Sequence, residues 1–268
     1  MSKMLQVAAF VAPLRRAPAP TAPLDTEALA GERVAVLDEM EGWVWGRLEA
    51  DGYEGYLPLA SLAPVVENTH RVTVPRTFVY PGPSIKLPPV GALPLGGLVR
   101  IELAAEDEQP GEFVRLSADT VIDGFAVGGY VFAAHLLPIA QRVGDPVSAA
   151  ETLLHAPYLW GGKTALGVDC SGLVQLSFAA CGVALPRDSG PQQAAAGVPV
   201  AEENGWQRGD LVFWPGHVGI LRDAQTVLHA SGHHMQVVSE PLEQASKRIA
   251  ERTGAPISLV RRVSLLTN

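Results

Sequence analysis

Cys170 lies in the stretch GVDCSGL at residues 167–173, where an apolar helical pattern begins. A thiol is a useful nucleophile only as the thiolate, and two features can lower its pKa: the positive end of a helix and a nearby imidazole. The position of Cys170 provides the first, and His217 and His229 are candidates for the second. A lone cysteine at such a position is more often buried packing, so the histidines decide the interpretation. These residue types together predict nucleophilic catalysis by Cys170.

The two histidines are twelve residues apart, in the strand-like segments PGHVGI and VLHA. If these strands form a hairpin, a symmetric loop of even length such as RDAQ would put the two imidazoles on opposite faces. A turn centred on Asp223 would instead place His217 directly across from His229. We therefore predict an odd-length turn or a bulge between residues 218 and 228.

The segment around these residues indicates an α+β domain. Asp145 and Pro146 are typical of a helix N-cap and first helical position, and a second helix is predicted from about Asp169 to Cys181, ended by Gly182. Three strands are expected to follow, in LVFW from 211, VGIL from 218 and TVLHA from 226.

The preceding half of the chain contains an internal repeat. GYLPLASLAP at 55–64 returns as GYVFAAHLLP at 129–138, and GERVAVL from 31 is echoed by GGLVRIEL from 96. Short aromatic and β-branched runs with turn signals predict two small all-β barrels, with the Pro/Gly-rich residues 80–97 as a long connecting loop. The expected domains are residues 1–66, 67–138 and 139–268.

Composition excludes several classes of partner. The formal net charge of −8 and the pI near 5.4 have the wrong sign for binding nucleic acid or an anionic membrane surface. No stretch approaches the roughly 20 apolar residues that span a bilayer. Cys170 and Cys181 lie eleven residues apart on one expected helix, about 16 Å at 1.5 Å per residue, so no disulfide is expected.

The first residues have some features of an export signal. Residues 4–14 are largely apolar and follow a lysine, but Arg15 and Arg16 come directly afterwards and prolines crowd the available cleavage sites. We therefore expect no signal peptide.

Four segments resemble the NlpC-type bacterial cell-wall cysteine peptidases, which are papain-like. They are PYLWGGKTALGVDCSGLVQLSF, LPRDSGPQQ, RGDLVFWPGHVGIL and VLHA, in unbroken order within about residues 139–240. The two repeats resemble the bacterial SH3-like barrels that often precede this catalytic domain. The resemblance implies an α+β papain-like domain, with helices packed on an antiparallel sheet, preceded by two small SH3-like barrels.

The resemblance also implies roles for individual residues. Cys170 would be the nucleophile, His217 the general base that later protonates the leaving amine, and His229 the residue that orients His217. Tyr158 would help the backbone N–H of Cys170 to hold the oxyanion.

Substrate-binding residues follow from the same resemblance. Asp169, Ser171 and Ser189 match positions that line the pocket in relatives cleaving after γ-D-glutamate, where the aspartate meets the free amine of an N-terminal L-alanine. Glu32 and Tyr53 are candidates on the first barrel. Each of these residues also has an ordinary structural explanation, as a helix cap, a turn residue, a strand start or a hairpin aromatic.

The predicted function is a cysteine peptidase that hydrolyses the γ-D-glutamyl–diamino acid bond of peptidoglycan stem peptides with a free L-alanine. We expect a cytoplasmic role in recycling, with an exported, periplasmic enzyme as the competing hypothesis. The barrels could gate the cleft or bind the wall as modules of a general endopeptidase or amidase. Two further hypotheses are a lipid-directed acyltransferase on the same fold and a non-catalytic wall-binding scaffold.

No cofactor and no metal are expected. A metal site at His229, His233 and His234 would lack the usual ligand spacing. The expected partners are peptidoglycan-derived peptides, and the sequence indicates neither the oligomeric state nor the preferred diamino acid.

Overall fold

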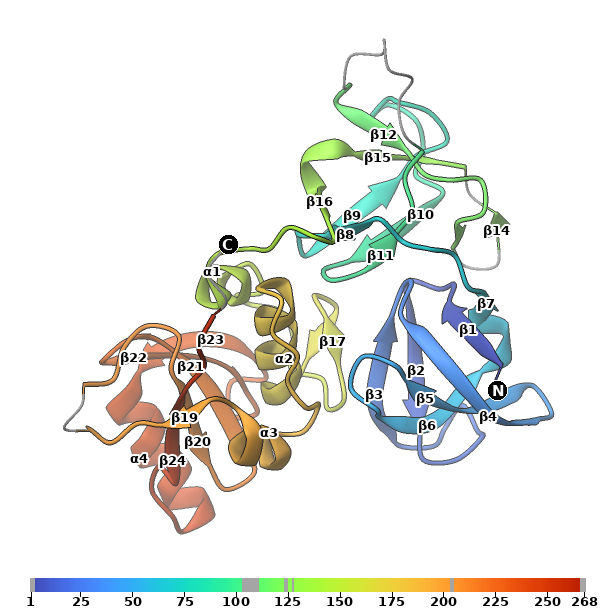
Figure 1. The fold of residues 1–268 in the computed structure, drawn as a ribbon. Helices are drawn as coiled ribbons and strands as arrows, with labels where there is room; N and C mark the ends of the chain where they lie inside the picture. The colour runs from blue at the N-terminus through green and yellow to red at the C-terminus, as the bar shows by residue number, and fades with distance from the viewer. Residues whose placement is uncertain (1–2, 103–110, 123–124, 127, 203–204, 266–268) are drawn as a thin grey trace. The chain divides into compact units, whose positions relative to one another are not determined.

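The computed structural model describes residues 3–102, 111–122, 125–126, 128–202 and 205–265. The chain divides into two compact units, residues 1–141 and 142–268 (Figure 1). Among the described residues, no helix is both long and apolar enough to cross a membrane.

The first unit begins with a seven-stranded antiparallel sheet of order β3-β2-β6-β5-β4-β1-β7. Its strands are β1 (Met4–Val7), β2 (Val11–Arg15), β3 (Leu24–Leu29), β4 (Arg33–Met40), β5 (Trp43–Leu48), β6 (Glu54–Pro58) and β7 (Leu62–Pro64). Alternating residues along these strands point inward, and they form an apolar core that includes Leu14, Val34, Leu48 and Leu57. This is the first SH3-like barrel.

A second set of short antiparallel strands follows in the same unit. It contains β8 (His70–Val72), β9 (Arg76–Val79), β10 (Gly91–Pro94), β11 (Leu98–Val99), β12 (Phe113–Arg115), β13 (Val121–Ile122), β14 (Phe125–Ala126), β15 (Tyr130–Phe132) and β16 (Leu136–Pro138). They pair as β10-β9, β11-β8-β16, β12-β15 and β13-β14. A second apolar core includes Val72, Leu93 and Val131, together with Ala30 from the turn after β3.

The internal repeat is confirmed at the level of structure. In both copies a strand leads through a 3-10 turn, at Leu59–Ser61 and at Ala133–His135, into a short final strand. The expected long loop at 80–97 is wrong for residues 91–94, because these residues pair with β9 as a strand. A high content of proline and glycine predicts a loop, but it does not show whether a neighbouring strand, here β9, is available for pairing.

The second unit packs helices on a six-stranded sheet of order β19-β24-β20-β21-β22-β23. Its elements are α1 (Pro146–Glu151), β17 (Lys163–Thr164), β18 (Gly167–Val168), α2 (Cys170–Ala180), α3 (Ser189–Ala195), β19 (Val198–Pro199), β20 (Leu211–Trp214), β21 (His217–Asp223), β22 (Thr226–Ser231), β23 (Gln236–Pro241), α4 (Leu242–Thr253) and β24 (Leu259–Arg262). Helix α2 packs on β21 and β22, and α4 packs against β22 and β23. The predicted α+β papain-like architecture with SH3-like barrels before it is confirmed.

Local sequence explains both helices that were predicted. The Asp145 side chain accepts from the N–H groups of Val147 and Ser148 at the start of α1. Asp169 caps α2, whose last residue, Ala180, is followed by Cys181 at the C-cap and by Gly182 with φ 77°. Nearly every residue of α2 is buried, so this helix is the apolar centre of the unit and its first residue is held firmly.

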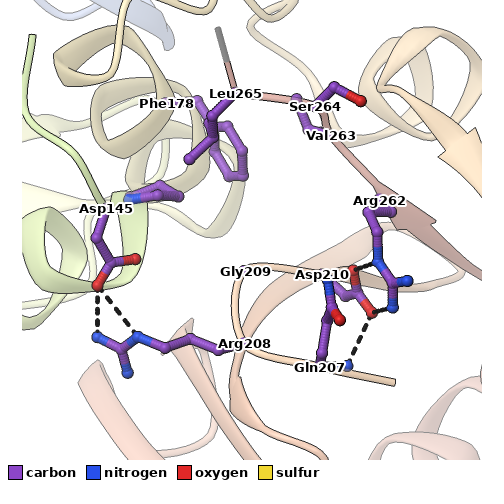
Figure 2. Close-up of a pocket in the computed structure, with 11 residues that line it drawn as sticks. Asp145, Phe178, Gln207, Arg208, Gly209, Asp210, Arg262, Val263, Ser264 and Leu265 are labelled. Atoms are coloured by element: carbon purple, nitrogen blue, oxygen red, sulfur yellow. Dashed lines mark hydrogen bonds and ion pairs between the residues drawn. The ribbon is translucent and has the colours of Figure 1, made fainter. Parts of the chain in front are cut away.

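Two arginine–carboxylate pairs lie around a pocket of about 310 Å³ in this unit (Figure 2). Arg262 of β24 donates from two nitrogens to Asp210, at 2.7 Å each, and Asp210 is buried. Arg208 reaches across to Asp145 at the start of α1, at 2.7 Å. Asp210, in the Gly-Asp pair at 209–210, therefore has a structural role, because it binds Arg262 of β24.

Candidate active site

Cys170 occupies the first position of α2 and is 7% exposed. Because α2 packs on β21, the backbone N–H of Val218 reaches the Cys170 sulfur, and the N–H of Ser171 also bonds to it. His217 is the residue immediately before Val218. The fold therefore places the nucleophile at the start of the strand that carries the base. Cys181 is buried at the far end of α2, and both cysteines are free.

The expected lowering of the Cys170 pKa is wrong for this enclosed site. Burial, and then the neighbouring Asp169 carboxylate, raise the thiol pKa to about 11, against the opposing effect of the two N–H bonds and Arg187. Burial also lowers the pKa of His217 to about 3, helped by the charges of His229 and Arg248. The resting site therefore holds a neutral thiol and a neutral imidazole.

The two histidines lie side by side, with His217 Nε2 at 2.7 Å from His229 Nδ1. The predicted bulge is present, because the register of β21 against β22 shifts between Leu221 and Asp223. The predicted direct opposition is wrong: Ile220 pairs with Leu228, so the residue facing His229 is Gly219. The imidazoles share a face as diagonal neighbours, which is still within reach of their rings.

Gly219 makes the diagonal contact possible. A Cβ on this residue would lie 2.6 Å from Val227 Cγ2 and 3.2 Å from His229 Cβ. The missing side chain leaves room for the His229 ring to lean toward His217. The buried Trp214 ring also lies near His217, at 5.7 Å between centroids. His217 thus contacts one aromatic ring and one imidazole.

Two residues that the sequence did not predict, Glu240 and Arg248, extend this chain of contacts. His229 Nε2 lies 2.8 Å from Glu240 Oε1, and Glu240 in turn accepts from two nitrogens of Arg248, one of them at 2.9 Å. Glu240 lies on β23, whose pairing with β22 puts it on the same face as His229. The sequence could have indicated Glu240 only through a further strand after TVLHA, and that strand was not predicted. We call His217, His229, Glu240 and Arg248 the histidine relay.

The relay determines which nitrogens carry protons. Burial alone would raise the pKa of Glu240, but hydrogen bonds from His229 and Arg248 and their charges lower it to about 2, so it is an acceptor. His229 Nε2 must then donate to Glu240, which leaves His229 Nδ1 to accept from His217 Nε2. The remaining nitrogen of His217, Nδ1, carries the lone pair that a general base needs.

Asp169 and Arg187 form a second cluster at the start of α2. Arg187 donates to both carboxylate oxygens of Asp169, at 2.9 and 2.7 Å, and the N–H groups of Gly161 and Gly172 donate to them at 2.8 and 2.7 Å. The side chains are 9% and 1% exposed for Asp169 and Arg187. A carboxylate offers about four acceptor sites. A substrate ammonium would therefore have to add to, or displace, partners that Asp169 already has.

The two predicted serines differ in surroundings. Ser171 is buried, donates to Asp169 Oδ1 at 3.3 Å and accepts from Arg187 at 3.0 Å. Ser189 is half-buried at the first position of α3, after Asp188 at the N-cap. Ser171 thus belongs to the Asp169–Arg187 cluster, whereas Ser189 lies on a neighbouring helix. Their contacts with substrate stay predictions.

Tyr158 lies close to the nucleophile in this unit. It forms an isolated bridge with Val168, two residues before Cys170, and its N–H donates to Met235 O at 2.9 Å. Burial, and then the charges of Cys170 and Asp169, raise the pKa of the Tyr158 phenol, while Arg187 and Arg252 act in the opposite direction. The phenol is a proton donor throughout the neutral range, as an oxyanion partner requires.

A cavity of about 880 Å³ opens beside the histidines. Tyr158, His217 and His229 line it, and the last turns of α4 form another wall. Exposed apolar side chains, Leu159 and Trp160, stand at its edge, and Trp160 is 65% exposed. A peptide segment could therefore reach the base from this side.

The barrel candidates are part of their own local structure. Glu32 accepts from the N–H of Leu29 at 2.8 Å in the turn between β3 and β4. Tyr53 packs against the first barrel core, and its N–H donates to Asp51 at 3.0 Å. These contacts fit an ordinary structural role for both residues, and their roles toward substrate stay predictions.

His233 and His234, the other two histidines of the metal site considered from the sequence, lie next to each other near Glu240. The His233 and His234 rings lie 4.8 Å apart, and His234 Nε2 is 3.6 Å from Glu240 Oε1. In the part of the chain that the structure describes, no group of three histidine, cysteine or acidic residues has a geometry suited to holding a metal ion.

Comparisons with known proteins match both parts of the chain. Residues 155–252 match the NlpC/P60 family, and residues 14–62 match the bacterial dipeptidyl-peptidase Sh3 domain. A gamma-D-glutamyl-L-lysine dipeptidyl-peptidase of Bacillus cereus is 28% identical over 71% of this chain and 60% of its own length. Dipeptidyl-peptidase 6 of Lysinibacillus sphaericus is 29% identical over 84% of this chain and 86% of its own length.

A solved structure agrees with the fold. An NlpC/P60 family protein from Bacillus cereus, 21% identical, superposes with a TM-score of 0.78 and covers 98% of this chain and 100% of its own. At this identity the likeness establishes the shared fold of barrels and catalytic domain.

Proposed function

We propose that this chain, a cysteine-type peptidase that carries an NlpC/P60 domain after its SH3-like barrels, hydrolyses the bond between γ-D-glutamate and the diamino acid of peptidoglycan stem peptides. The single observation that carries the proposal is the histidine relay beside Cys170, with Glu240 directing the lone pair of His217 Nδ1. The names of the two dipeptidyl-peptidases support the choice of bond.

In the first half of the reaction, His217 Nδ1 takes the thiol proton of Cys170 as the sulfur attacks the γ-glutamyl carbonyl carbon. The transfer accompanies attack because both groups rest in their neutral forms. The carbonyl oxygen becomes an oxyanion, which accepts hydrogen bonds from the Cys170 N–H and the Tyr158 hydroxyl. Such donors are each worth about 2.7–4 kcal/mol.

In the second half, the proton on His217 passes to the nitrogen of the diamino acid as the carbon–nitrogen bond breaks. The diamino acid leaves as a free amine, and the γ-glutamyl group remains as a thioester on Cys170. His217 then removes a proton from water, which attacks the thioester and regenerates the thiol. His229 and Glu240 keep Nδ1 directed at the reaction through both halves.

We further propose that the preferred substrate has a free N-terminal L-alanine, as a peptide released from its glycan does. Such a substrate places the enzyme in the cytoplasmic recycling of wall fragments, which cell fractionation would test. Asp169 is the predicted partner of the ammonium, but Asp169→Asn would also disturb the pair with Arg187. Varying the substrate is therefore the cleaner test of this feature.

The test is mass spectrometry of products from L-Ala-γ-D-Glu-diaminopimelate and from its N-acetylated form. We expect L-Ala-γ-D-Glu and free diaminopimelate from the first peptide. The acetylated peptide should react at least about tenfold more slowly, since it lacks one charge-assisted hydrogen bond of about 1.5–3 kcal/mol. Equal rates would instead indicate a general wall endopeptidase with the barrels as binding modules. Cleavage at another bond would overturn the proposed function.

A further inference from the structure

The cavity beside the histidines is lined by the base that must serve the leaving group. His217, which must protonate the leaving amine, lines it, together with the turn at Pro215 and Gly216. Asp169, Ser171 and Ser189, the residues expected to contact the acyl portion, do not line it. A γ-glutamyl peptide with its carbonyl at Cys170 would thus extend its diamino acid into this cavity.

The far wall of the cavity is the last turn of α4, and it carries two exposed charges. Glu251 and Arg252 both line the cavity. Among the described residues, neither side chain makes an ion pair or a hydrogen bond, whereas Arg248, one turn earlier, is engaged by Glu240. The charge of Arg252 also acts on the Tyr158 hydroxyl, so it lies near the reacting centre.

Resting on the proposed function, we infer that Glu251 and Arg252 recognise the distal end of the diamino acid, and that Arg252 makes the enzyme prefer diaminopimelate to lysine. The distal carbon of diaminopimelate carries an ammonium and a carboxylate, and lysine carries the ammonium alone. An acidic and a basic side chain on adjacent positions of one wall match the zwitterion, with Glu251 on the ammonium and Arg252 on the carboxylate.

The two residues therefore have separable effects. Arg252→Gln removes the partner of a group that only diaminopimelate has. Glu251→Gln removes the partner of a group that both diamino acids have. Because both side chains lie on the wall of an open cavity, the effect of each is expected near the upper end of exposed ion pairs, about fivefold to tenfold in kcat/KM, mainly through KM.

The experiment measures kcat/KM of the full chain on L-Ala-γ-D-Glu-diaminopimelate and on L-Ala-γ-D-Glu-L-lysine. Wild type should prefer the first peptide. Arg252→Gln should lose about fivefold to tenfold on the diaminopimelate peptide and less than about twofold on the lysine peptide, with partial recovery in Arg252→Lys. Glu251→Gln should slow both peptides. Lys247→Gln is the matched control, because Lys247 lies on α4 and does not line the cavity.

The outcomes separate this inference from the function on which it rests. If wild type cleaves neither peptide at the γ-glutamyl bond, the proposed function fails and the inference fails with it. If wild type cleaves both, but Arg252→Gln changes both equally, changes neither, or behaves like Lys247→Gln, the inference is wrong while the proposed function stands.

Discussion

The peptidase unit contains two carboxylate–arginine pairs near its reacting groups, and they are built differently. Asp169 and Arg187 are almost completely enclosed, with side chains 9% and 1% exposed. Glu240 and Arg248 are 12% and 26% exposed, and Glu240 shares its carboxylate between the arginine and His229. In the described part of the chain, the first pair, at the start of α2, does not extend to the histidines. The second ends a chain of contacts that leads to the base.

This difference suggests different roles: the Asp169–Arg187 pair contributes to stability, and the Glu240–Arg248 pair helps to set the protonation of the histidines. Burial would lower the pKa of Arg187, but Asp169 raises it, so the guanidinium stays charged inside the protein. Neither partner can be removed without leaving the other buried and unpaired. Glu240 instead acts on His229 and, through it, on His217. We therefore expect damage to the Asp169–Arg187 cluster to affect folding first, and damage to the histidine relay to affect the reaction first.

The largest expected effect is on turnover, from removing the reacting groups themselves. Cys170→Ala and His217→Ala should each lower kcat by about 10⁵-fold, because groups that act as one unit fail together. His229→Ala should retain at least about tenfold more activity than His217→Ala, since it orients the base and does not carry the proton. Steady-state kinetics with far-UV circular dichroism as a folding control measure this, and equal activity in all three variants would refute the assigned roles.

The next effect is on stability. Arg187→Leu should reduce the free energy of unfolding by about 3–5 kcal/mol, because it leaves the Asp169 charge buried without its partner. Arg248→Leu should reduce it by about 1 kcal/mol or less, as expected for a partly exposed pair. Urea denaturation of the two variants makes the comparison. Similar losses of unfolding free energy in both variants would show that the two pairs contribute equally to stability.

A smaller effect should appear in Glu240→Gln, and it should be seen first in activity. An amide can donate as well as accept, so it no longer fixes the protons of His229 and His217. We expect kcat to fall by about 10- to 100-fold in protein that is still folded at the assay temperature.

The pH profile distinguishes this positioning role from a general structural defect. The Glu240 charge raises the pKa of His217, against burial and the charges of His229 and Arg248, which lower it. Removing that charge should therefore move the acid limb of kcat/KM to lower pH. An unchanged profile in Glu240→Gln would remove Glu240 from the relay.

The last expected effect is the pH dependence of stability, which is spread over several pH units. The His217 pKa is about 3 in the folded protein and 6.5 as its ordinary value, so between these the unfolded chain binds the extra proton. Stability should therefore fall as pH is lowered through this window, by up to about 1.4 kcal/mol per pH unit. Glu240, with its pKa lowered from 4.5 to about 2, adds a loss of the same sign below pH 4.5.

Urea denaturation between pH 7 and pH 4.5, in wild type and in His217→Asn, isolates the histidine contribution. The variant should show the shallower dependence. Parallel curves would mean that His217 is as accessible to protons in the folded protein as in the unfolded chain.

Much of the site was predictable because its signals are local. Asp145 and Asp169 mark helix starts, since a capping carboxylate needs only the next three N–H groups. Gly182 marks a helix end through its own φ. The order of Tyr158, Cys170, His217 and His229 was enough to indicate a papain-like domain, and the repeat was enough to indicate two barrels.

Other parts depended on pairing between distant segments. The diagonal contact of His217 with His229 follows from a bulge near Leu221 that shifts the register by an amount the loop length did not reveal. Glu240 enters the site only because β23 pairs with β22, and Arg187 reaches Asp169 across 18 residues of chain.

By itself, the sequence determined the kind of chemistry, because nucleophile, base and helix caps are set by residue type and short spacing. Only the tertiary structure decided the protonation state of the thiol and the imidazole before the reaction. Enclosure by surrounding elements buries Cys170, and this desolvation outweighs the neighbouring N–H groups that favour a thiolate. The burial of a residue depends on many segments that are distant in the sequence, so a short sequence pattern cannot predict it.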